Sequence, residues 1–358
     1  MTKSSRPIKG RGAVNNPHAR YNRYTSEEID DGWHQDEELP ALETTVQTEN
    51  SKSIITYNQS PDLPFDRSIN VYRGCEHGCI YCFARPTHAY YGLSPGLDFE
   101  TRLFVKPEAA SLLSEEIQKK TYQCAPIALG TNTDPYQPIE RKWQLTRQIL
   151  EVLHQHNHPV TIVTKSSLIE RDIDILEAMS KQQLAHVMIS VTTLDKALAR
   201  KLEPRAVSPA RRLQTIKRLI EREIPTSLMV APIIPHLTDY EIERIIEAAD
   251  ECGVVSAHSV LLRLPLEVAT LFSHWLETYF PLKKQHVLNN VRNTRSGKLN
   301  DAAFGQRFKG EGAYASMITQ RFNLKCKQLG LARKSPPLAT HLFRKRIEDS
   351  NQLDIFNS

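Results

Sequence analysis

Residues 73–84 of the chain read RGCEHGCIYCFA, and every other interpretation of the sequence starts from them. Cys75, Cys79 and Cys82 are spaced with three and then two residues between them. Metal sites built only from cysteines normally use four thiolates. Three thiolates can ligate three irons of a cubane [4Fe–4S] cluster and leave the fourth iron open. The spacing therefore predicts a cluster whose fourth ligand is a small molecule.

A zinc site is the alternative interpretation of the same stretch. His88 follows Cys82 after five residues, so the pattern also fits a Cys3His zinc site in a basic, non-catalytic RNA-binding protein. Such zinc modules are usually small and self-contained. A chain of 358 residues, 40% of them hydrophobic, can form its core without a metal. The context therefore favours the cluster over zinc.

The bulk composition is that of a soluble globular protein. Six cysteines are too few for a disulfide scaffold, and half of them lie within eight residues. The amino-terminal stretch has no apolar core of the kind found in secretory signals, and no apolar run is long enough to span a membrane. We therefore expect a cytoplasmic protein with no membrane partner.

Charge and hydropathy divide the chain into three parts. Residues 1–64 are polar, with six basic side chains up to residue 24 and then one lysine against ten acids, and we expect a largely disordered arm. Residues 65–280 form the predicted core domain. Residues 281–358 carry fifteen Lys and Arg against five Asp and Glu, and form a predicted basic carboxy-terminal extension.

Short apolar runs alternate with amphipathic segments through the core. The runs are continuous, which is typical of parallel strands buried on both faces. The predicted strands are 69–72, 126–130, 159–165, 185–193, 226–234 and 255–262, and the predicted helices are 107–121, 141–156, 169–182, 208–223, 238–253 and 266–280. Six strand–helix units predict an α/β fold, either a partial (β/α)6 barrel or a doubly wound sheet. The pattern alone does not separate the two.

The cysteine spacing, with Tyr81 just before the last cysteine, resembles the radical S-adenosylmethionine (SAM) superfamily over residues 68–280. The resemblance implies a partial (β/α)6 TIM-like barrel and one [4Fe–4S] cluster whose open iron is chelated by SAM. It also implies that the reduced cluster cleaves SAM to a 5′-deoxyadenosyl radical that abstracts hydrogen from a substrate. An electron donor of the flavodoxin or ferredoxin type would reduce the cluster.

Within that superfamily the chain is most similar to the branch related to spore photolyase, a DNA-repair enzyme. The similarity rests on the cluster loop and on TNTD (131–134), VTKS (163–166) and LEPR (202–205). It implies that Tyr81 packs on adenine and that Thr133, Lys165 and Ser190 contact SAM. Thr131 stands where spore photolyase has its hydrogen-donating cysteine. The same repair route is therefore not expected, and the substrate is unassigned.

Polar residues elsewhere give further candidates, each with a structural alternative. Tyr136, Gln137 and Glu140 follow the TNTD segment, and Thr192, Glu203 and Arg205 follow the fourth strand. A salt bridge at the barrel rim is the simpler explanation for Glu203 and Arg205. In the extension, five basic residues could face nucleic-acid phosphate, namely Arg292, Arg295, Lys298, Arg307 and Lys309. A solvated surface explains the same modest charge excess.

Overall fold

The computed structural model of the chain describes residues 8–21 and 42–345, and it has a mixed α/β fold. Its main sheet has seven strands, of which six are parallel and the edge strand β2 is antiparallel. In spatial order they are β10 (Ala257–Leu261), β9 (Thr226–Ile233), β8 (Ala185–Ser190), β7 (Val160–Thr164), β6 (Ile127–Leu129), β3 (Arg67–Ile69) and β2 (Ile55–Tyr57).

The strand order separates the two architectures that the sequence left open. From β3 to β10 each new parallel strand is added beside the previous one, without a reversal. Because crossovers are right-handed, a sheet that grows in one direction carries its helices on one face, whereas a doubly wound sheet reverses its order. Among the described residues no ladder joins β10 back to β2 or β3. The expected partial (β/α)6 barrel is therefore confirmed, as an open sheet.

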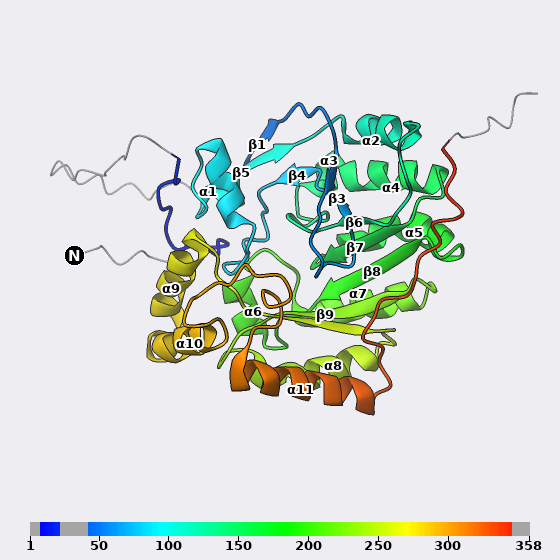
Figure 1. The fold of residues 1–358 in the computed structure, drawn as a ribbon. Helices are drawn as coiled ribbons and strands as arrows, with labels where there is room; N and C mark the ends of the chain where they lie inside the picture. The colour runs from blue at the N-terminus through cyan, green and yellow to red at the C-terminus, as the bar shows by residue number, and fades with distance from the viewer. Residues whose placement is uncertain (1–7, 22–41, 346–358) are drawn as a thin grey trace, which may run out of the picture.

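The helices lie around the outside of this sheet (Figure 1). Those that follow the parallel strands are α2 (Ala109–Gln118), α4 (Leu145–Gln155), α5 (Ile173–Ser180), α7 (Pro209–Ile220), α8 (Ile242–Asp250) and α9 (Glu267–Tyr279). The shorter ones are α1 (Asp98–Thr101), α3 (Glu140–Trp143), α6 (Lys196–Leu202) and the 3-10 helices η1 (Arg85–Tyr91), η2 (Ser167–Asp172) and η3 (Asp239–Glu241). None of the helices in residues 8–21 and 42–345 combines the length and the apolar character needed to cross a bilayer.

The first predicted strand, 69–72, lies at a junction between two strands. β3 ends at Ile69, and the chain re-enters extended structure as β4 (Tyr72–Arg73) in a second, smaller sheet of order β1-β5-β4. Asn70 lies between them, and its Oδ1 accepts hydrogen bonds from the backbone N–H groups of Asn132 and Thr133. That side chain binds the neighbouring loop, so the chain leaves the main sheet where the apolar run suggested it would continue.

The described part of the expected disordered arm forms regular structure. β1 (Thr45–Thr48) pairs in parallel with β5 (Arg102–Val105), and β2 pairs with β3. Strand pairing satisfies the backbone groups of this polar segment, although it has few apolar side chains to bury. Residues 8–21 also pack against the core, with Ala13 and Val14 buried. Residues 1–7 and 22–41 of the expected arm lie outside the described residues.

The expected carboxy-terminal extension begins with α10 (Pro281–Asn293) and continues through a loop to α11 (Gly312–Gln328). The loop lies along β10, where Leu261 N–H donates to the Phe308 carbonyl at 2.9 Å. After α11 the chain passes the amino-terminal ends of the strands, and Arg344 N–H donates to the His156 carbonyl. Figure 1 shows this last segment in red at the edge of the sheet.

Candidate metal and cofactor site

One cavity of about 250 Å³ opens at the carboxyl ends of β6 to β10. All seven residues predicted as metal or cofactor ligands line it: Cys75, Cys79, Cys82, Tyr81, Thr133, Lys165 and Ser190. Carboxyl ends of parallel strands meet at one edge of a sheet, which is why residues 115 apart in sequence come together here. Their roles as ligands stay predictions.

Arg85 holds the cysteine loop in place from within. Its guanidinium is fully buried and donates to the backbone carbonyls of Gly78, Cys79, Pro95 and Gly96. These bonds satisfy carbonyls that a tight loop cannot pair within itself. The charge of Arg85 is balanced by the buried carboxylate of Glu100 at 2.5 Å. The loop is therefore fixed by backbone contacts that leave the thiols free.

The amino-terminal segment closes over the other side of this loop. The N–H groups of Gly12 and Ala13 donate to the two carboxylate oxygens of Glu100 at 2.9 and 2.8 Å. Gly12 lies so close to the loop that a Cβ at this position would overlap the carbonyl oxygen of Gly78. Only glycine permits that approach. Residues 8–21 are therefore part of the wall behind the cysteine loop.

The donor set fits the predicted cluster. Burial raises the pKa of the Cys79 thiol to about 12 and that of Cys75 well above its ordinary value, so a metal would have to displace protons to bind. Among the described residues no three potential ligands converge on a single-ion site. Three thiolates that each bind a different iron need not converge on one point.

His88, the fourth ligand of the alternative zinc site, points elsewhere. Its Nε2 is 2.8 Å from the Arg102 carbonyl, and its ring packs edge-on against Phe99. It does not line the cavity. The arrangement therefore does not supply the histidine that the zinc alternative requires.

Tyr81 is held by a buried charge pair behind it. Its hydroxyl donates to the Glu203 carboxylate, which also accepts from Thr192 at 2.7 Å and is paired with Arg212. Burial disfavours the charged form of Glu203, but Arg212 and then Lys165 outweigh it, and the pKa falls to about 2. The simpler explanation for Glu203, a salt bridge, is therefore correct, and the pair fixes the Tyr81 ring at the cavity.

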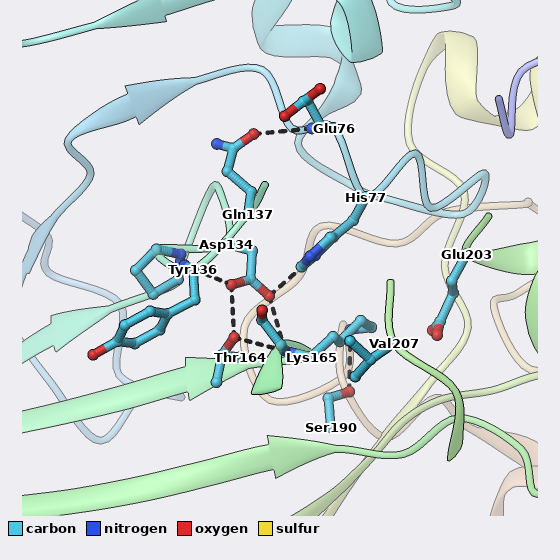
Figure 2. A network of polar contacts seen from close by, with 12 residues as sticks. Glu76, His77, Asp134, Tyr136, Gln137, Thr164, Lys165, Ser190, Glu203 and Val207 are labelled. Atoms are coloured by element: carbon cyan, nitrogen blue, oxygen red, sulfur yellow. Dashed lines mark hydrogen bonds and ion pairs between the residues drawn. The ribbon is translucent and has the colours of Figure 1, made fainter. Parts of the chain in front are cut away.

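Lys165 and Ser190 approach each other across neighbouring strands, as Figure 2 shows. The Lys165 ammonium donates to Ser190 Oγ at 3.1 Å and lies 6.0 Å from the centre of the Tyr81 ring. Behind them Asp134 accepts from the Lys165 N–H at 2.8 Å and from Thr164 Oγ1 at 2.7 Å. The lysine is thus aimed into the cavity by its backbone, while its charge stays available.

His77 lines the cavity beside the three cysteines. It is 2% exposed, and its Nδ1 is 3.3 Å from Asp134 Oδ2 (Figure 2). Burial raises the pKa of Asp134, yet His77 and the hydrogen-bond donors around it lower that pKa to about 2. The pair connects the cysteine loop to the loop after β6.

Thr133 and Thr131 are both tied to the chain that precedes the cysteines. Thr133 Oγ1 donates to the Tyr72 carbonyl, and Thr131 Oγ1 accepts from the Asn70 amide at 3.2 Å. Both residues line the cavity. The TNTD segment is thereby held against the residues that lead into the cysteine loop.

The residues after TNTD are structural. Tyr136 donates to Asp172, Gln137 bonds the Gly74 carbonyl and the Glu76 N–H, and Glu140 accepts from Tyr72 and Arg171. All three are fully buried and none lines the cavity. Arg205 pairs with Glu76 at 2.9 Å, which is the rim salt bridge that the sequence offered as its simpler explanation.

Sequence reasoning missed one wall of the cavity. Phe83, Met229, Pro232, Arg263 and Phe308 line it as well. Met229 and Pro232 belong to β9, so the apolar run that marked the strand also contained wall residues. Arg263 lies two residues after the end of β10, in LLRLP, and a charge close to the end of a strand was the available signal.

Only some of the basic residues predicted to form a surface on the extension are exposed and unpaired. Arg295 is 1% exposed, and its guanidinium donates to the backbone carbonyls of Leu261 and Leu262. Its assignment to nucleic-acid phosphate was therefore wrong, because these carbonyls already bind it. Arg307 is paired with Asp62 at 2.5 Å. Lys298 and Lys309 are exposed.

Comparison with known proteins places this geometry in a family. Residues 69–249, just over half of the chain, match the radical SAM superfamily. An uncharacterised protein of Mycobacterium tuberculosis is 39% identical over 177 residues, which are 49% of this chain and 52% of that protein. An uncharacterised protein of Methanocaldococcus jannaschii is 28% identical over 62% of this chain and 80% of its own length. The match thus spans about half the length of the mycobacterial relative.

The fold is also that of spore photoproduct lyase, as the predicted branch implied. One variant of that enzyme is 14% identical with a TM-score of 0.57, and 79% of each chain is covered. A second, solved with bound AdoMet and dinucleoside spore photoproduct, is 13% identical with the same TM-score and coverage. At this identity the likeness concerns the fold alone. On the superfamily match and the cysteine-lined cavity at the strand ends, the chain belongs to the radical SAM superfamily of enzymes.

Proposed function

We propose that the chain binds one [4Fe–4S] cluster through Cys75, Cys79 and Cys82, binds SAM beside it, and abstracts a hydrogen atom from a substrate. The observation that carries the proposal is the convergence of the three cysteines with Tyr81, Thr133, Lys165 and Ser190 on one cavity. When bound, the cluster and SAM together would supply a 5′-deoxyadenosyl radical. The protein contributes binding, orientation and exclusion of water.

Each predicted SAM contact has a defined task in this proposal. Lys165 offers a cation to the carboxylate of SAM, and Ser190 holds that cation in the cavity. Tyr81 presents its ring to adenine, in an orientation that Glu203 sets through the phenol hydroxyl. Thr133 offers a hydroxyl from the opposite loop. A set of groups held by buried partners positions a ligand without a large loss of side-chain entropy.

The walls of the cavity protect a reactive carbon from solvent. Its lining includes Val163, Met229, Leu261 and Leu262 besides the polar ligands. Apolar walls exclude water and competing hydrogen donors. An electron donor of the flavodoxin or ferredoxin type completes the proposal as an external partner.

The proposal includes a nucleic-acid substrate, but with fewer basic residues in contact with phosphate than the sequence predicted. Lys298 and Lys309 are exposed and could contact phosphates, whereas Arg295 is not available. If they do, binding of a polynucleotide weakens steeply between low and moderate salt. Binding that is indifferent to salt would contradict this part of the proposal alone.

The central test uses anaerobically purified and reconstituted protein. We expect about four irons and matching sulfide per chain, an EPR signal after reduction that changes when SAM is added, and slow release of 5′-deoxyadenosine. Replacing all three cysteines by alanine serves as the matched control and should abolish each signal. One zinc per chain, no sulfide and no response to SAM would overturn the proposal.

A further inference from the structure

We propose that Arg263 binds an oxyanion of the substrate, a phosphoryl or carboxyl group, at the end of the cavity away from the predicted SAM contacts. The proposal rests on the proposed function, because it assigns a substrate group to the same cavity. It begins from the side chain itself, which lines the cavity and is partly buried. Within the described part of the chain, Arg263 forms no hydrogen bond and no ion pair.

Two aromatic rings orient the guanidinium. Its central carbon lies 5.0 Å from the centre of the Phe83 ring and 5.7 Å from that of Phe308. Stacking on aromatic faces positions an arginine while its five N–H donors stay free at the edge of the plane. Phe83 directly follows Cys82 in sequence, so this cation stands beside the cysteine loop.

Three hydrogen bonds hold the backbone on either side of Arg263. Leu262 N–H donates to the Ile233 carbonyl, Leu264 N–H donates to the Leu299 carbonyl, and Arg295 donates to the Leu262 carbonyl. These bonds fix the residues on both sides of Arg263. A group that is fixed before its ligand arrives binds with less loss of entropy.

The neighbouring arginine shows what Arg263 lacks. Arg307 also lies over the Phe308 ring, 4.7 Å from its centre, but its guanidinium donates to both carboxylate oxygens of Asp62. Burial and then Arg307 lower the pKa of Arg263, and Asp62, the carboxylate that favours its charged form, is already bound by Arg307. A partly buried guanidinium without an acceptor is costly, and a substrate oxyanion would satisfy it with paired hydrogen bonds.

The position of Arg263 separates it from the predicted cofactor cation. Lys165 follows β7 and Arg263 follows β10, and three strand spacings lie between those strands. At about 4.8 Å per spacing their backbones are roughly 14 Å apart. The cavity therefore offers one cation at each end, and the carboxylate of a SAM molecule at Lys165 leaves the other end for a second anion.

The test measures how fast phenylglyoxal modifies Arg263 in the reconstituted protein with SAM present, read by peptide mass spectrometry. Inorganic phosphate, acetate and chloride are compared at matched ionic strength. A single charge-assisted pair binds with a dissociation constant on the order of millimolar. Phosphate at ten times that constant should slow modification roughly tenfold. Arg200, exposed on α6, is the internal control and should not be protected.

The outcomes distinguish the sources of the oxyanion. Protection by phosphate alone supports a phosphoryl group, and protection by acetate as well supports a carboxyl group. Protection by SAM without either anion overturns the proposal, because Arg263 would then serve the cofactor. Equal rates in phosphate and chloride also overturn it. The same comparison on protein without cluster or SAM separates this result from a failure of the proposed function.

Variants give a second, independent measurement. We expect Arg263→Gln to abolish the broadening of the phosphate 31P resonance that the native protein causes, and Arg263→Lys to retain part of it. Both variants should bind SAM as the native protein does. A loss of SAM affinity in Arg263→Gln with an unchanged melting temperature would contradict the assignment to substrate.

Discussion

Glu203 is 2% exposed and ionised, and Arg212, its partner, is equally buried. Because water does not reach either side chain, the attraction between the two charges must offset most of the hydration that both lose on burial. The pair supports the Tyr81 hydroxyl at the same time. At the scale of single residues, the stability of the protein and the orientation of a predicted cofactor contact thus depend on one carboxylate.

Replacing Arg212 by Met should lower the free energy of unfolding by about 3–5 kcal/mol, because it leaves Glu203 charged and unpaired in the interior. Arg211, the preceding residue, pairs with Glu170 near the surface, and Arg211→Met should cost no more than about 1 kcal/mol. Urea unfolding of both variants measures the difference. Equal losses would show that the Glu203 carboxylate is reached by solvent.

Lys165→Met should weaken SAM binding by about 10- to 100-fold, because a charge-assisted hydrogen bond contributes about 1.5–3 kcal/mol. Lys196, exposed at the start of α6, provides the control variant Lys196→Met. Equilibrium binding to the reconstituted protein reports both affinities. Unchanged binding in Lys165→Met would remove Lys165 from the predicted SAM contacts.

At the scale of elements, the sequence predicted the strands more accurately than the helices and loops between them. β7, β8 and β9 lie within their predicted ranges, because a strand buried on both faces leaves a continuous apolar run in the sequence. The predicted helix 141–156 is interrupted at Gln144, which has a φ of 51°. When a residue other than glycine adopts the left-handed backbone conformation, the sequence gives no sign of it. The role of residues 8–21 is likewise set by tertiary contacts.

The amino-terminal segment yields a prediction of its own. Gly12→Ala should force this segment away from Gly78, with a loss of about 1–3 kcal/mol, and should reduce the iron retained per chain after reconstitution. Gly10→Asn is the matched control, because Gly10 has open space and a φ of 76° that asparagine tolerates. Iron content and urea midpoints should fall in the first variant only. If both variants keep their iron, the segment does not support the loop.

At the scale of the whole molecule, the stability of the fold should depend on acid through two buried histidines. His158 hydrogen-bonds with Tyr122 and His186 with Ser227, and burial lowers the pKa of each to about 4. The unfolded chain binds these protons near pH 6.5 and the folded chain does not. The stabilisation is therefore complete above that pH and declines toward pH 4.

Each histidine should contribute about 2 kcal/mol to the stability lost between pH 7 and pH 5. His186→Gln removes one titrating group, so its urea midpoint should shift less between these two pH values than that of the native protein. His341, which is exposed, supplies the control variant His341→Gln with a native shift. Identical shifts in all three proteins would show that His186 does not titrate differently on unfolding.

The candidate site shows where prediction from sequence stops. Cys75, Cys79 and Cys82 are close in sequence, and Lys165 and Ser190 end apolar runs, so motif and periodicity both pointed to them. Arg263, by contrast, acquires its setting from Phe83, far earlier in the chain, and from Phe308, more than 40 residues later. Arg295 lies in that extension and looked equally basic, yet backbone carbonyls surround it. The presence of a basic residue in a sequence does not reveal whether the folded chain supplies a hydrogen-bond acceptor for it.

The contacts of the amino-terminal segment also set an order of events during synthesis. Asn15 bonds His274 at 2.6 Å and Arg20 pairs with Glu267, although 259 and 247 residues separate the partners. The segment emerges from the ribosome before the barrel, and its contacts with Glu100 can form early. Those of Asn15 and Arg20 must wait until α9 has been made. Residues made early in synthesis are therefore among the last to reach all of their final contacts.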